Sequence, residues 1–143
     1  MLTINALAVA NKVVIPVDCQ YLATKGMVDT LNIIRKVQRN INKNLKMGKV
    51  LFTLVDKRTN LPKIVHDEIK KNYGNFVKIY DSQIPRAIKT AESTSRGKSI
   101  FAYDHNSKVA EAYSLFAKEV LMEDEKERRK NVLAKDSNTR WFF

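Results

Sequence analysis

The 143 residues are enough for one domain, because a chain of about 150 residues buries roughly 70% of the surface that its unfolded form exposes. The composition, 44% hydrophobic and 29% charged, is globular, and no apolar run approaches the ~20 residues that cross a bilayer. Residues 1–10 carry no basic residue ahead of their apolar stretch, unlike a secretory signal. We therefore expect a cytoplasmic protein with no membrane partner.

The charge is the strongest signal in the composition. Lys and Arg number 26 against 15 Asp and Glu, so the net charge is +11 and the isoelectric point lies near 9.8. Such an excess attracts polyanions whatever the fold, nucleic acid first and an anionic membrane surface second. A solvated helical face or a generally lysine-rich composition produces the same sum, and this alternative stays open.

The first half of the chain predicts two helices and two strands. Residues 2–10 indicate a helix that is already apolar at its first residue and has no room for a capping residue, so we expect a further segment before it. Residues 13–17 predict a buried strand, and residues 50–55 a second strand that is buried on both faces because its apolar residues do not alternate. Between them, residues 24–41 predict an amphipathic helix. Its apolar stripe comprises Met27, Val28, Leu31, Ile34, Val37 and Ile41.

The second half continues the alternation. Residues 61–73 predict a helix, capped by Asn60 and ended by Gly74, and residues 77–84 a third strand. We expect a short helical turn over residues 86–92, a loop over 93–98 and a helix that Ser107 caps. Its apolar face comprises Val109, Ala112, Tyr113, Phe116 and Val120. Residues 123–130 predict a solvated extension with i,i+4 pairs from Asp124 to Arg128 and from Glu125 to Arg129, before an aromatic tail at 139–143.

This order of elements predicts an α/β fold with a parallel sheet and flanking helices. Right-handed crossovers place both connecting helices on one face of the sheet, so the helix after Ser107 covers the other face. Three strands form a small sheet for a fully parallel design, and residues 13–17 are expected at an open edge. We therefore expect an incomplete fold.

Polar residues gather at the carboxyl end of the strand at residues 50–55, where α/β sheets bind ligands. They are Thr53, Asp56, Arg58 and Thr59. No catalytic group stands out, and the scattered glycines form neither a GxxxxGK[ST] nor a GxGxxG phosphate loop. The single Cys19 and the two histidines have no partner at ligand spacing, so we expect no metal site.

Several strings, in order and at matching spacing over residues 1–122, resemble the ParA/Soj family of partition ATPases, which is related to MinD. The strings are Leu2–Leu7, Val14–Val17, Thr53–Leu61 (T-x-x-D-x-R-T-N-L), Ile84–Arg86, Gly97–Ile100, Tyr103–Asp104, Ala110–Tyr113 and Ala117–Val120. The resemblance implies the C-terminal part of a P-loop NTPase fold, with residues 123–143 as a charged helical extension and aromatic tail. The family's phosphate loop and metal-linked aspartate have no counterpart in these 143 residues.

The resemblance also implies roles for individual residues. Thr53 and Asp56 match the motif beside the adenine of ATP, and Pro85 with Arg86 matches the loop that closes over the base. Arg58, Arg86 and Lys89 are expected to contact DNA without reading its sequence. The chain departs from the family pattern at three places: Lys89 replaces an arginine, Ser93–Arg96 replaces A-P-S-H and Val109 replaces a glycine. Lysine keeps the charge but loses the bidentate fork of arginine.

The family implies ATP and Mg as cofactors, non-specific DNA and a ParB-like protein as partners, homodimerisation and association with the nucleoid. We expect these 143 residues to bind neither cofactor alone and to hydrolyse no ATP, because phosphoryl transfer requires a phosphate cradle, a lysine and a metal site. The alternative is a self-sufficient basic module that binds nucleic acid without nucleotide.

Overall fold

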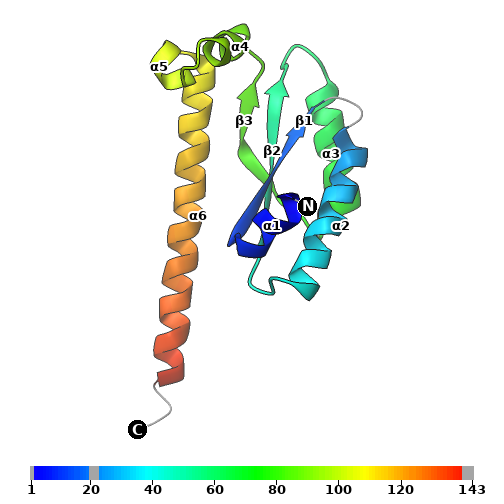
Figure 1. Ribbon diagram of the computed structural model, residues 1–143, viewed down its shortest axis with the longest axis vertical. Helices are drawn as coiled ribbons and strands as arrows, with labels where there is room; N and C mark the ends of the chain where they lie inside the picture. Colours follow the sequence, from blue (N-terminus) through cyan, green and yellow to red (C-terminus); the bar gives the residue numbers. More distant parts are fainter. Residues whose placement is uncertain (1, 20–22, 140–143) are drawn as a thin grey trace.

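A computed structural model describes residues 2–19 and 23–139, except for the side chains of residues 23–25 and 135–139. Three parallel strands form one sheet in the order β1-β2-β3, namely Lys12–Asp18, Lys46–Val55 and Ile79–Pro85. Helices α2 (Ala23–Asn40) and α3 (Leu61–Tyr73) connect them and lie on one side of the sheet, opposite α6 (Lys108–Thr139) (Figure 1). The parallel α/β prediction is confirmed.

The first face of the sheet carries the larger core. The apolar stripe of α2 packs there with Val65 and Ile69 of α3, against Val50, Phe52 and Val55 of β2. Leu7 from α1 (Leu2–Val9) joins the same core. The predicted stripe is wrong at Ile41, which follows the end of α2 and is 55% exposed, because the chain turns toward β2 there.

The second face is covered by the first half of α6. Residues Val109, Ala112, Tyr113, Phe116 and Val120 pack on Leu51, Tyr80 and Ile84, as the periodicity predicted. The rings of Tyr80 and Phe116 meet edge to face, with 5.1 Å between their centroids. Ser107 caps this helix, since its Oγ accepts a hydrogen bond from the Ala110 N–H at 3.2 Å.

The prediction of two buried strands, the second of them buried on both faces, is only partly right. In β1, Val14 and Pro16 are exposed while Ile15 and Val17 are buried, because α6 lies over β2 and β3 and leaves this part of β1 uncovered. In β2, Leu54 is 48% exposed and adopts a φ of 53°, so its side chain leaves the core one residue before the strand ends.

Strand β1 is an edge strand, paired with β2 from Lys12↔Lys46 to Asp18↔Thr53. The two strands pass closely at Gly48, where a Cβ would lie 1.8 Å from the Val13 carbonyl oxygen. Glycine is therefore required at this register shift, since any side chain would collide with the backbone of the neighbouring strand.

The connection between β3 and α6 differs from the prediction. Helix α4 spans Ile88–Ser95, so half of the expected loop over residues 93–98 is helical, and a further short helix, α5, spans Ile100–Asp104. Ser99 caps α5 by accepting from the Ala102 N–H at 3.2 Å. Asn60 precedes α3 as expected, but its side chain makes no capping hydrogen bond.

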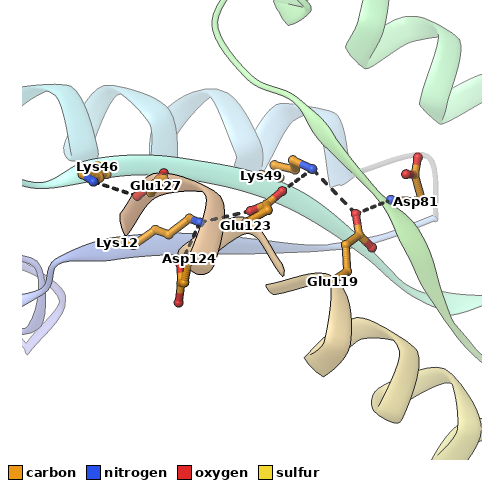
Figure 2. A network of polar contacts seen from close by, with 8 residues as sticks. All are labelled: Lys12, Lys46, Lys49, Asp81, Glu119, Glu123, Asp124 and Glu127. Atoms are coloured by element: carbon orange, nitrogen blue, oxygen red, sulfur yellow. Dashed lines mark hydrogen bonds and ion pairs between the residues drawn. The ribbon is translucent and has the colours of Figure 1, made fainter. Parts of the chain in front are cut away.

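The charged part of α6 is attached to the sheet by ion pairs rather than fully solvated. The Lys12 ammonium lies 3.0 Å from a Glu123 oxygen and 3.5 Å from Asp124, and Lys46 lies 2.7 Å from Glu127 (Figure 2). Lys49 pairs with Glu123 as well. In the described part of the chain, Asp124 therefore pairs with the sheet instead of Arg128. Helix α6 runs through Met122 without a break.

Strand β3 contains extra residues that α6 accommodates. Val50 and Phe52 of β2 are two positions apart, whereas their partners Ile79 and Gln83 are four positions apart, so β3 bulges between them. The Glu119 carboxylate accepts a hydrogen bond from the backbone N–H of Asp81 at 3.0 Å (Figure 2). It also accepts one from the backbone N–H of Ser82, at 3.0 Å. Glu119 thus accepts the hydrogen bonds that these two N–H groups, because of the bulge, do not donate to β2.

Candidate functional site

The carboxyl ends of β2 and β3 meet at a cavity of about 1060 Å³. The register pairs Val55 with Pro85, and the Arg86 N–H donates to the Val55 carbonyl at 3.0 Å. The residues that follow each strand are therefore neighbours. Five of the six residues predicted from the sequence line this cavity: Asp56, Arg58, Pro85, Arg86 and Lys89.

Asp56 and Arg58 form a closed pair within one turn. The Asp56 carboxylate accepts from the Arg58 backbone N–H at 3.0 Å and from its side chain at 2.9 Å (Nε) and 2.7 Å (Nη2). The Thr59 hydroxyl donates to the Asp56 carbonyl oxygen at 3.1 Å. The hydrogen bonds from Arg58 lower the pKa of Asp56 to about 2. The guanidinium fork is thus occupied by the carboxylate of its own turn.

Lys89 is also paired, with Asp104 of α5. The hydrogen bond that Lys89 donates to Asp104 raises the pKa of Lys89, and the same bond lowers the pKa of Asp104. Asp104 is a partner of Lys89 that the periodicity did not reveal, because α5 is too short to show a helical pattern. The string Tyr103–Asp104, which carries part of the family resemblance, was the signal that could have identified it.

Helix α5, which ends with Asp104, is held against α4 by contacts of Tyr103. The Tyr103 hydroxyl donates to Glu92 at 2.9 Å, and the Arg96 guanidinium lies 5.5 Å from the centre of the Tyr103 ring. This fixes the distance between the two short helices and hence the position of Asp104 opposite Lys89. Arg86 is exposed, and in the described part of the chain it has no ion pair, unlike Arg58 and Lys89.

Thr53 lies apart from the other predicted residues. It is half-buried, and its hydroxyl donates to the Val17 carbonyl of β1 at 3.4 Å. It does not line the cavity, because Leu54 and Val55 come between Thr53 and the end of the strand. The structure thus places Thr53 between β1 and β2, and the other five residues between β2 and β3.

A second cavity, of about 510 Å³, was not anticipated. It lies beside β3 and the start of α6, where Lys57, Asp81 and Gln83 face Lys108 and Glu111. Its lining mixes both signs of charge. No residue pattern in the sequence could have identified it, since its walls come from β2, β3 and α6.

The residues present fit a base better than a triphosphate with its metal. Asp56, Pro85 and Arg86 offer a polar and an apolar wall, but two of the four cations that line the cavity are already paired with carboxylates. Among the described residues, no three His, Cys, Asp or Glu side chains are grouped as metal ligands. Within the same residues, no helix is long and apolar enough to cross a membrane.

Similar folds occur in nucleotide-binding enzymes. The crystal structure of cobyrinic acid a,c-diamide synthase from Mycobacterium smegmatis superposes on 84% of this chain with a TM-score of 0.67 and 31% identity, and the match covers 41% of that enzyme. The same enzyme has been solved with ADP and magnesium. The fold and the cavity at the strand ends therefore define an α/β protein of the P-loop NTPase type.

Sequence comparison narrows this class. The chain is 45% identical over 120 residues to the sporulation initiation inhibitor protein Soj of Bacillus subtilis, covering 84% of this chain and 47% of Soj. It is 36% identical to the chromosome-partitioning ATPase Soj of Treponema pallidum (87% and 48% covered) and 31% identical to ParA of Caulobacter vibrioides (85% and 45%). A family model described as an AAA domain matches residues 1–47. The chain belongs to the Soj/ParA family and spans about half the length of these relatives.

Proposed function

We propose that this chain is the base-binding and DNA-contacting part of a ParA-type partition ATPase. The observation that carries the proposal is the meeting of Asp56, Pro85 and Arg86 at the paired ends of β2 and β3. The family resemblance implies that this edge of the sheet lies beside the adenine. The proposal includes cytoplasmic location at the nucleoid, a ParB-like partner and homodimerisation as properties of the intact protein.

These 143 residues do not hydrolyse ATP by themselves. The phosphates and their metal need a backbone cradle and a lysine, and the sequence carries no P-loop motif. Contacts to the base alone leave the charge of the triphosphate unmatched. Nucleotide affinity is therefore millimolar at best, and without a phosphate cradle ATP gains little affinity over adenosine.

The test compares adenosine with ATP. Titration followed by NMR should give the same weak affinity for both ligands, with the largest shifts at Asp56 and Arg86, and no phosphate release above buffer. Tenfold tighter binding of ATP, or hydrolysis that is lost in Asp56→Asn, would contradict the proposal. Glu125→Gln, on the exposed side of α6, is the matched control because it removes one carboxylate far from the cavity.

The same edge is also proposed to contact DNA. Arg58, Arg86 and Lys89 line one cavity, where they hold phosphates without reading bases. Changing Arg58 and Lys89 to alanine together should weaken binding equally for unrelated duplexes and lower the slope of log affinity against log salt by up to about two. A loss that depends on the DNA sequence would be incompatible with this role.

The net charge of +11 favours the second candidate, a basic module that binds nucleic acid without nucleotide. The two proposals differ in what adenosine does. A base-binding site requires the adenosine shifts described above, whereas the module shows DNA binding with no response to adenosine.

A further inference from the structure

We propose that the main surface for nucleic-acid phosphates in this chain lies at the amino ends of β2 and β3, opposite the cavity. The surface, here called the amino-edge patch, is defined by Arg39, Lys43, Lys70, Lys71 and Lys78. This inference builds on the proposed DNA binding and assigns its principal contact to other residues. The evidence for it is the position in the fold of the cations that have no ion pair.

The patch is formed by the way the two crossover helices end. Both α2 and α3 connect parallel strands on the same face, so both run toward the edge where β2 and β3 begin (Figure 1). The α2 end and its following loop supply Arg39 and Lys43, and the α3 end and its loop supply Lys70, Lys71 and Lys78. The Arg35 guanidinium, 4.6 Å from the centre of the Phe76 ring, joins α2 to the loop after α3.

The two segments carry charge of one sign. Residues 37–50 and 69–80 together contain seven Lys and Arg and no Asp or Glu. Two of the seven, Lys46 and Lys49, are paired with α6. The remaining five are the patch, all are exposed, and none has an ion pair within the described residues. By contrast, two of the four cations at the cavity, Arg58 and Lys89, are each held by a carboxylate.

Helix dipoles explain only part of this arrangement. A cation in the last turn of a helix is stabilised by the carbonyl groups there, which accounts for Arg39, Lys70 and Lys71. Lys43 and Lys78 lie in loops, where no helix end favours a positive charge. Five exposed like charges repel one another, and Asp67 and Glu68, one turn earlier on α3, form no ion pair with them within the described residues. Binding of a polyanion relieves this repulsion.

The other side chains of the patch favour a sugar-phosphate backbone over a membrane. Exposed amides stand among the cations, at Asn40, Asn44, Asn72 and Asn75, and amides donate hydrogen bonds to phosphate oxygens. The exposed ring of Phe76 is stacked under Arg35 and so is not free to enter a lipid layer. We therefore assign the patch to double-stranded nucleic acid, contacted through phosphates and without sequence preference.

The test measures binding of the full chain to two unrelated 24-base-pair duplexes by fluorescence anisotropy over a range of salt. In the patch variant, Arg39→Ala, Lys43→Ala and Lys71→Ala, the salt slope should fall by about two to three, because each phosphate contact contributes about 0.9. Affinity at about 0.1 M salt should fall roughly tenfold or more for both duplexes. Circular dichroism and thermal unfolding establish that the variant is folded.

The matched control removes the same charge from the far part of α6, through Arg128→Ala, Arg129→Ala and Lys130→Ala, and its slope should stay near that of the unaltered chain. A larger loss in this control, or an unchanged patch variant, overturns the proposal. If DNA affinity is lost only in the double variant Arg58→Ala, Lys89→Ala, the proposal about the amino-edge patch is also overturned. In that case the cavity remains the DNA contact of the proposed function. Sedimentation with phosphatidylserine vesicles, without duplex binding, would assign the patch to a membrane and reject nucleic acid.

Discussion

The Glu119 carboxylate accepts a hydrogen bond from the backbone N–H of Ser82, with 3.0 Å between Oε2 and the nitrogen. The same carboxylate accepts from the N–H of Asp81, and Lys49 lies 3.6 Å away. A side chain of α6 thus completes the hydrogen bonding of a strand that bulges away from its neighbour. The packing of α6 and the shape of β3 depend on each other through this one residue.

Replacing Glu119 by alanine should lower the free energy of unfolding by about 1–3 kcal/mol, because two backbone N–H groups, the partly buried one of Ser82 and the exposed one of Asp81, lose their acceptor. Urea unfolding followed by circular dichroism measures the loss. Glu125→Ala is the control, since Glu125 lies exposed on the same helix with no ion pair in the described structure. Equal midpoints for the two variants would show that water replaces the carboxylate at no cost.

Acid should loosen α6 from the sheet. Partial burial raises the pKa of Glu123, but its ion pairs with Lys49 and Lys12 outweigh this effect and bring the pKa below its ordinary value. The pKa of Glu119 is lowered in the same way, by the bonds from Asp81 and Ser82 against partial burial. When the pKa of a carboxyl group is lower in the folded chain than in the unfolded chain, the ionised group stabilises the fold. This stabilisation is fully present above the unfolded pKa of 4.5 and is lost as the pH falls below it.

The free energy of unfolding should therefore be level above about pH 5.5 and decrease as the pH falls through 4.5 and below. Unfolding in urea at a series of pH values measures it. Glu123→Gln should show a shallower decrease, because one of the linked protons is removed. An acid decrease that is equally steep in this variant would place the linkage on other carboxylates.

Two glycines should respond oppositely to alanine. Gly48→Ala forces a Cβ against the Val13 carbonyl oxygen, so the pairing of β1 with β2 must shift at a cost of roughly 1–3 kcal/mol or more. At Gly26, within α2, nothing lies within 4 Å of the position that a Cβ would take, and alanine there should stabilise by about 0.5–1 kcal/mol. Thermal unfolding of both variants checks the pair. A Gly48→Ala variant as stable as the unaltered chain would contradict the close passage of the strands.

Asp56 should titrate far below an ordinary aspartate. Its pKa of about 2 arises first from the hydrogen bonds of Arg58, so Arg58→Ala should bring it back toward 3.8. The carboxyl carbon shift in NMR reports the titration directly. Lys57→Ala, a loss of charge in the same turn, should leave the midpoint in place. A midpoint near 3.8 in the unaltered chain would mean that the Arg58 fork is free to bind phosphate.

The sequence anticipated the parts of the fold that local patterns encode. The stripe of α2, the stop of α3 at Gly74 and the apolar face of α6 all follow from periodicity, and the strand ends placed Asp56 beside Arg86. Short elements carry too few residues for a pattern. This is why α5 and its partner for Lys89 were missed, and why α4 extends beyond its predicted end.

Contacts between distant segments also escaped prediction. The i,i+4 spacing made Arg128 the natural partner of Asp124, but Lys12 lies closer in space. Thr53 comes only three residues before Asp56, yet its hydroxyl contacts β1 because the neighbours of a strand residue depend on sheet order. Such pairings are a property of the assembled sheet, and no spacing along the chain reports them.

The late position of α6 in the sequence determines when the second face of the sheet can be covered during synthesis. Lys12 and Glu123 are 111 positions apart, and Lys46 and Glu127 are 81 apart. The unit of β1, α2 and β2 is complete early in synthesis, but Leu51, Tyr80 and Ile84 meet α6 only after most of the chain has been made. At about 5–20 residues per second, the nascent chain shows an apolar sheet face to solvent for seconds, long enough for a chaperone to bind it.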